Sequence, residues 1–245
     1  VYPAMEKRLS ETYTKRSLAG LSKSTYDSYV KAFRWASDRI PQNEGGIVAF
    51  ISNGAWLDGI GQDGMRRCIE EEFTSVYVLN LRGNQRTSGE LSRKEGGKIF
   101  GSGSRTPIAI TFLVKNPAKK WQKAVIHYHD IGDYLTREQK LKLVKDFRSI
   151  SSQKLEWQII TPNDKADWIN QRDGVFDNLI PLFDKKGVGV FNHNGPAVAT
   201  GRDVWVNNFS NSQLDDNINC LINNYNAQCR EFQTIKSQEK ALSVE

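Results

Sequence analysis

Residues 96–107 read GGKIFGSGSRTP, a glycine-rich basic stretch of the kind that can hold phosphates. A nucleotide cradle needs its glycines between the end of a strand and the start of a helix, where backbone N–H groups converge on the phosphates. Here the order is reversed, because Gly101 and Gly103 lead through Pro107 into an apolar run typical of a strand. No Gly-Lys-Ser/Thr comes after them. The stretch therefore does not predict a nucleotide cradle.

The charge of the surrounding segment predicts contacts with a polyanion. Residues 82–106 carry six basic and two acidic side chains, a surplus of four in a chain whose net charge is +6. The basic residues are Arg82, Arg86, Arg93, Lys94, Lys98 and Arg105. Six glycines in the same segment indicate a flexible loop whose backbone can approach the phosphates of a double helix. A solvated basic surface loop is the alternative.

Phe100 is the only aromatic residue of this loop. A ring exposed among basic side chains can stack on a nucleobase, either in a single strand or flipped out of a duplex. A lone phenylalanine in a loop can equally be an anchor in the hydrophobic core. The residues themselves leave both interpretations open.

Other polar residues suggest chemistry less specifically. His127 and His129 alternate along one predicted strand, with Asp130 and Asp133 after them, and could form a metal site. A half-buried edge strand explains the same pattern, so we assign no metal ligands. The pair Arg202 and Asp203 could touch DNA or form an ordinary ion pair beneath Trp205. The three cysteines form no C-x-x-C pair and lie far from the histidines, which favours a reduced, cytoplasmic setting.

Hydrophobic periodicity predicts the elements that position the loop. Buried strands are expected at 47–52 (IVAFIS), 76–81 (VYVLNL) and 108–114 (IAITFLV), with an edge strand at 124–129 (AVIHYH). Helices are expected at 25–39 after a capping box of Ser24 and Asp27, around Met65 to Phe73, and from Thr136 to about Ser149. The first two strands and their helix form a crossover unit of a parallel sheet. The third strand comes after no helix and should therefore pair antiparallel with 76–81 as a long-looped hairpin.

Composition bounds the class of protein. The chain has 245 residues, of which 38% are hydrophobic and 25% charged, as in a globular protein with a sizeable core. No apolar run approaches the roughly 20 residues of a spanning helix, so no membrane partner is expected. From about residue 151 the pattern changes to isolated tryptophans among turn signals. We expect a domain boundary between 151 and 190, and divide the chain into domains at 1–165 and 166–245.

Several stretches together resemble a known family. STYDSYVKAFRWASDRI, GGIVAFISNGAWLDG and VYVLNLRGNQRTSGELSRKEGGKIFGSGSRTPIAITFLVKN resemble the distal half of the adenine amino-methyltransferase domain of single-polypeptide type I (type ISP) restriction–modification enzymes. YHDIGDYLTREQKL, NDKADWINQRD and TGRDVWVNNFS are similar to the region after that domain, where target recognition begins. The family methylates the exocyclic amine of adenine in duplex DNA with S-adenosylmethionine. Its members add an ATP-driven translocase and a nuclease.

The resemblance implies an α/β fold, the C-terminal half of a Rossmann-like methyltransferase sheet with an antiparallel last strand, followed by a mixed α+β region. Strands 47–52 and 76–81 would be the fifth and sixth of that sheet, and 108–114 the seventh. Phe100 matches the position that places an aromatic ring against the extruded base. Asn53, at the carboxyl end of 47–52, could line the pocket rim, although an ordinary turn residue is the simpler interpretation.

The family's catalytic Asn-Pro-Pro-Tyr motif and glycine-bearing cofactor turn are absent from the sequence. The first residues, VYPAMEKRL, resemble the segment shortly after that motif. We therefore expect an inactive fragment with no catalytic or cofactor-binding residues, which needs the N-terminal part of the same polypeptide. S-adenosylmethionine would bind only in the complete enzyme. A nucleic-acid-binding module without chemistry is the alternative function, and an ATP-driven motor is disfavoured because no Walker-type lysine loop is visible.

Overall fold

The computed structural model describes residues 2–19, 23–41, 43–101, 103–119, 123–175, 178–183, 189–191 and 201–242. The chain divides into two compact units, Val1–Gly174 and Val175–Glu245, and each is described by itself. Ala166 and Trp168 are buried in the core of the first unit. The first unit therefore extends beyond residue 165, where the sequence suggested a boundary.

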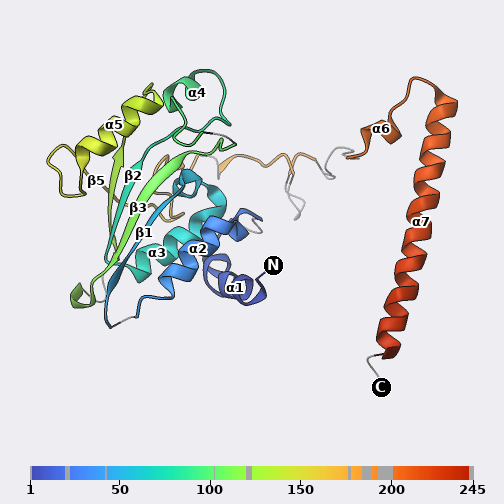
Figure 1. The fold of residues 1–245 in the computed structure, drawn as a ribbon, viewed down its shortest axis with the longest axis horizontal. Coiled ribbons are helices and arrows are strands. Elements are labelled where there is room, and N and C mark those ends of the chain that lie inside the picture. Colours follow the sequence, from blue (N-terminus) through green and yellow to red (C-terminus); the bar gives the residue numbers. More distant parts are fainter. Residues whose placement is uncertain are drawn as a thin grey trace. The chain divides into compact units, whose positions relative to one another are not determined.

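The described residues of the first unit form a mixed five-stranded sheet with the order β1-β3-β2-β4-β5. The strands are β1 (Gly46–Asn53), β2 (Ser75–Asn80), β3 (Ile108–Lys115), β4 (Val125–Asp130) and β5 (Gln158–Ile160). β3 lies antiparallel between β1 and β2, β4 is parallel to β2, and β5 is antiparallel to β4 (Figure 1). The predicted antiparallel pairing of the third strand with the second is confirmed.

β1 and β2 run in the same direction within one sheet, as the predicted crossover unit requires, although β3 is inserted between them. One prediction about the sheet was wrong. The segment 124–129 was expected at the edge, yet β4 pairs with β2 on one side and with β5 on the other. The three residues of β5 are too few to produce a recognisable alternation in the sequence.

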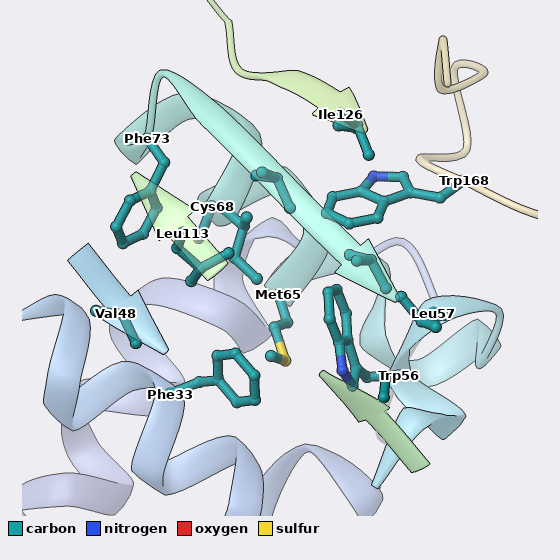
Figure 2. Close-up of a cluster of buried hydrophobic side chains, with 14 of the residues drawn as sticks. Phe33, Val48, Trp56, Leu57, Met65, Cys68, Phe73, Leu113, Ile126 and Trp168 are labelled. Atoms are coloured by element: carbon teal, nitrogen blue, oxygen red, sulfur yellow. The ribbon is translucent and has the colours of Figure 1, made fainter. Parts of the chain in front are cut away.

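One face of the sheet packs against α1 (Pro3–Leu9), the adjoining turn Ser10–Thr14, α2 (Ser28–Ser37) and α3 (Asp63–Glu72). Figure 2 shows the buried side chains between these layers. The Trp56 ring lies 5.6 Å from that of Phe33 and 5.2 Å from that of Trp168, measured between centroids. Burying such large rings supplies much of the apolar area that stabilises the unit.

α2 begins later than the sequence indicated. Residues Lys23–Tyr26 form a short 3-10 turn, and the helix starts at Ser28 with Asp27 in the N-cap position. The Asp27 side chain makes no capping hydrogen bond there, so the capping box expected from Ser24 and Asp27 is not formed.

The opposite face of the sheet carries α5 (Arg137–Phe147). Thr136 accepts a hydrogen bond from the Gln139 N–H, and the Gln139 side chain accepts one from the Thr136 N–H, which is the predicted capping box. Phe147 is buried with Leu79 and Ile108 in a second apolar cluster. α5 is thereby fixed over β2 and β4.

The second unit contains α6 (Asp203–Val206) and α7 (Asn211–Leu242). Among the described residues, no helix is both long and apolar enough to cross a membrane. The three cysteines of the chain are free thiols.

Candidate nucleic-acid interface

The basic loop joins β2 to β3 at the carboxyl ends of β1 and β2. We call residues 82–107 the cationic loop. The Gly54 N–H, just beyond β1, donates to the Pro107 carbonyl at 2.9 Å, and the Leu81 N–H donates to the Ile108 carbonyl at 2.8 Å. Asn53 pairs with Ile108 in the sheet register. The loop and Asn53 therefore meet at the edge where open α/β sheets hold their ligands.

The cationic loop is anchored, which corrects the expectation of a flexible loop. It contains a short helix, α4 (Gly89–Glu95), near α5 in Figure 1. The Gly83 N–H donates to the Glu95 carbonyl at 3.1 Å, closing the helix back on the start of the loop. The Gly97 N–H donates to the Leu135 carbonyl at 2.9 Å. These bonds give the loop a defined shape.

Two glycines of the loop serve this anchoring and not an approach to phosphates. A Cβ on Gly96 would lie 2.2 Å from the Leu135 carbonyl oxygen, and one on Gly97 would lie 2.4 Å from the Arg137 backbone nitrogen. Gly96 also has a φ of +65°, which favours glycine. Around Gly101 and Gly103, by contrast, the described residues leave open space, with no atom within 4 Å of an added Cβ.

The Arg82 side chain forms ion pairs within the protein. Its guanidinium group lies 2.6 Å from an Asp130 carboxylate oxygen and also pairs with Asp133. Its backbone has a φ of 55°, unusual outside glycine, and its N–H donates to the Asn80 side-chain oxygen at 2.9 Å. These bonds hold the turn by which the chain leaves β2. Arg82 is therefore a scaffold residue of the loop, and we leave it out of the candidate phosphate contacts.

The other cations of the loop are more available. Arg93 lies 3.3 Å from Glu90, Lys94 lies 4.0 Å from Asp133, and Arg105 donates to the Gln85 carbonyl at 3.0 Å. Such partly or fully exposed pairs stabilise a protein little and are readily exchanged for a phosphate. Arg86 and Lys98 have no carboxylate partner within the described ranges. These two are the strongest candidates for phosphate contacts.

Phe100 has 49% of its surface exposed, and no aromatic ring or cation stacks on it among the described residues. Its neighbour Ile99 is 6% exposed and belongs to the apolar cluster beneath α5. Ile99 therefore anchors the loop in the core, and the Phe100 ring remains accessible. Stacking of this ring on a base stays a prediction.

Asn53 acts as a turn residue. Its side-chain oxygen accepts a hydrogen bond from the Ala55 N–H at 3.0 Å and caps the 3-10 turn Gly54–Leu57. Trp56, a residue of this turn, is buried in the core, and a Cβ on Gly54 would lie 3.3 Å from the Ala109 side chain. The turn thus offers no open cradle for a cofactor. A pocket-rim role for Asn53 stays a prediction.

His127 and His129 belong to an aromatic cluster. The His127 ring stacks on Tyr77 with centroids 4.4 Å apart, and burial lowers the pKa of His127. His129 Nδ1 lies 2.8 Å from the Glu156 carbonyl oxygen, and its ring meets Phe147 edge-on. Within the described residues, no group of three or more metal-ligating side chains is found.

Comparison with known proteins first gives a class. Residues 189–245 match the family described as the type ISP C-terminal specificity domain. No curated protein matches the chain.

Solved structures then give particular relatives over most of the chain. It is 46% identical to a nuclease-deletion mutant of the type ISP restriction–modification enzyme LlaGI, solved with a DNA substrate mimic, with a TM-score of 0.78 over 92% of this chain and 18% of that one. It is 39% identical to the ATP-dependent type ISP enzyme LlaBIII bound to DNA, with a TM-score of 0.82 over 93% and 15%. It is 31% identical to DrdV in a DNA complex, with a TM-score of 0.75 over 93% and 22%. The chain therefore spans less than a quarter of each of these proteins.

Proposed function

We propose that this chain is part of a DNA adenine-N6 methyltransferase of a restriction–modification enzyme. In this proposal the cationic loop contacts the backbone of duplex DNA, and Phe100 supports the target base. The observation that carries the proposal is an accessible Phe100 ring in the same loop as the cations Arg86 and Lys98, a loop that joins β2 to β3 at the carboxyl edge of the sheet.

Duplex DNA is the partner that the chemistry favours. Cations that are not neutralised within the protein displace the counterions condensed on the DNA phosphates. The release of these counterions drives binding. LlaGI, LlaBIII and DrdV are described in complex with DNA or a DNA mimic, and the match of residues 189–245 is to a specificity domain. We therefore assign duplex DNA to this chain as well, in the cytoplasm.

Methyl transfer to adenine rests on the arrangement of the sheet. An antiparallel last strand beside the sixth strand is what the resemblance implies, and β3 occupies that relation to β2. Within the described sheet β1 has a free edge without charged residues, and Ile47 and Ile51 are 66% and 61% exposed. Long uncharged edges are normally paired or covered. This supports completion of the sheet by the N-terminal part of the same polypeptide.

S-adenosylmethionine is the methyl donor in this proposal. The turn after β1 is filled by core side chains, and the turn after β2 is closed by the Arg82 ion pairs. The strand ends present in this chain therefore do not fit the cofactor, and we assign none of its residues to hold it. Its cradle and the Asn-Pro-Pro-Tyr acceptors belong to the rest of the enzyme. In this proposal the chain contributes Phe100, which positions the target base, and the cationic loop, which contacts the DNA backbone.

A DNA-recognition module without chemistry is the second candidate. The specificity-domain match of residues 189–245 favours it, because recognition needs no methyl donor. The two candidates differ in whether the target base leaves the duplex. Methyl transfer needs an extruded base held by an aromatic ring, whereas a recognition module has no need of base extrusion.

Replacing Arg86, Arg93 and Lys98 by alanine tests the backbone contacts. We expect duplex affinity to fall for every sequence, and the slope of log K against log[salt] to flatten by about 0.9 per lost contact. Fluorescence anisotropy of a labelled duplex over a salt series measures both. The matched control replaces the exposed Lys142, Lys145 and Lys154, which removes the same charge from elsewhere. An equal change in both variants would show that only net charge matters, and the loop would lose its proposed role.

A further inference from the structure

Lys140 is a lysine buried at the base of the cationic loop. Its side chain is fully buried, and its Nζ donates to the Glu95 carbonyl at 2.7 Å and to the Gly97 carbonyl at 2.9 Å. Both carbonyls belong to the end of α4 and the turn directly after it. The ammonium group thus binds the loop backbone directly.

A second cation from the same helix continues this contact. Arg137 Nε donates to the Ile99 carbonyl at 2.7 Å. Together with the bond from the Gly97 N–H to the carbonyl of Leu135, just before α5, these contacts hold residues 95, 97 and 99 against the N-terminal end of the helix. Lys98 and Phe100 are the side chains that this stretch carries toward the surface.

The location of these cations is unfavourable for the helix itself. The N-terminal end of a helix carries a partial positive charge, which disfavours Lys and Arg there. Burial also penalises an ammonium group, and it lowers the pKa of Lys140 to about 8. An apolar side chain would fill the same space without either cost. Residues that violate such local rules commonly serve a functional site.

We infer that Lys140 and Arg137 are positioning residues, which hold residues 95–99 against α5 so that Lys98 and Phe100 are presented to DNA. The inference rests on the proposed function. In this inference Lys140 and Arg137 bind carbonyls of the loop backbone, whereas Arg86 and Lys98 contact the DNA phosphates.

Hydrogen exchange tests the contact in the free chain. Lys140→Met keeps an unbranched side chain but removes the ammonium group, and with it both hydrogen bonds. We expect the Gly83 and Gly97 amides to exchange about tenfold faster, because the loop then opens more often, while amides in the centre of β2 and β3 are unchanged. Lys145→Met is the matched control, an exposed lysine of the same helix. Unchanged exchange of the two glycine amides would overturn the inference.

A double-mutant cycle tests the link to DNA. We expect Lys140→Met to weaken duplex binding about fivefold in the wild-type background, and less than twofold in a chain that already carries Lys98→Ala and Phe100→Ala. Equal losses in both backgrounds would show that Lys140 does not act through these side chains. If Lys140→Met fails to fold, the same double-mutant cycle is measured with Arg137→Met, because the Arg137 side chain is exposed and lies outside the core.

The outcomes separate this inference from the proposed function. If the Lys98→Ala/Phe100→Ala variant binds duplex DNA as tightly as the wild type, the proposed function fails, and the inference fails with it. If that variant binds weakly while the losses caused by Lys140→Met are equal in both backgrounds, only the inference fails.

Discussion

Ile99 and Phe100 are adjacent residues with opposite environments. Ile99 is 6% exposed in the cluster beneath α5, whereas Phe100 is 49% exposed. Folding therefore depends on the first side chain and leaves the second free to meet a ligand. Substitution of Ile99 should therefore affect stability, whereas substitution of Phe100 should affect function.

Phe100→Ala should impair the enzyme without unfolding it. In the complete methyltransferase we expect a loss of about 1–3 kcal/mol in transition-state stabilisation, the range of a lost base-stacking contact. Steady-state methylation of a duplex carrying the target site gives this value from kcat/KM. The control is Leu91→Ala, which truncates a 65% exposed side chain of α4. Full activity of Phe100→Ala would exclude a role of the ring in holding the base.

The sequence identified the candidate residues but could not sort them. It counts six cations in the loop, yet Arg82 is neutralised by Asp130 and Asp133, which lie 48 and 51 positions further along the chain. Such pairs become visible only when β2 and β4 are side by side. Lys140 and Arg137 were missed for a related reason, because their partners are backbone carbonyls. Their one signal is the placement of cations in the first turns of a helix.

The segment after β5 is held against α3 by buried polar contacts. Arg66 Nε donates to the Ala166 carbonyl at 2.6 Å, and Trp168 Nε1 donates to a Glu70 carboxylate oxygen at 2.7 Å. Asp167 accepts two bonds from the Arg172 guanidinium group, at 2.9 and 2.8 Å, one from the Arg172 backbone N–H at 3.3 Å, and one from Asn163. These bonds close the first unit just before it ends at Gly174.

The stability of this segment should fall at low pH. The Arg172 hydrogen bonds lower the pKa of Asp167 to about 2, from 3.8. Since the unfolded chain then binds the proton more tightly, about 2 kcal/mol of stability is present above pH 4 and is lost as the pH falls toward 2. Urea unfolding followed by tryptophan fluorescence measures it. Asp167→Asn should be less stable at pH 7 and should lose less stability below pH 4.

The exposed neighbour Asp164→Asn is the control for that measurement. If wild type and Asp167→Asn lose stability in parallel between pH 4 and pH 2, the Asp167 contacts contribute nothing to folding.

Elements with an apolar pattern were predicted well. β1, β2, β3, α3 and α5 coincide with runs or helical spacings of buried residues, and the capping box of α5 forms as expected. α4 was missed because none of its residues is buried, so GELSRKE carries no periodicity. The insertion of β3 between β1 and β2 depends on long-range pairing, which local patterns do not encode.

At the scale of the whole molecule, the two units have different roles in the proposal. The first places a cationic loop and an accessible ring at one edge of its sheet. The second carries the match to a specificity domain. The proposal assigns cofactor binding to neither unit.

Site-specific cross-linking is the most direct test of whether the cationic loop faces DNA. Arg86 and, in a second variant, Lys142 of α5 would each be replaced by the photoreactive p-benzoylphenylalanine, since both side chains are exposed. Each variant would then be irradiated with a bound duplex. We expect a cross-link to DNA from position 86 and little or none from position 142. A cross-link from position 142 with none from position 86 would contradict the account.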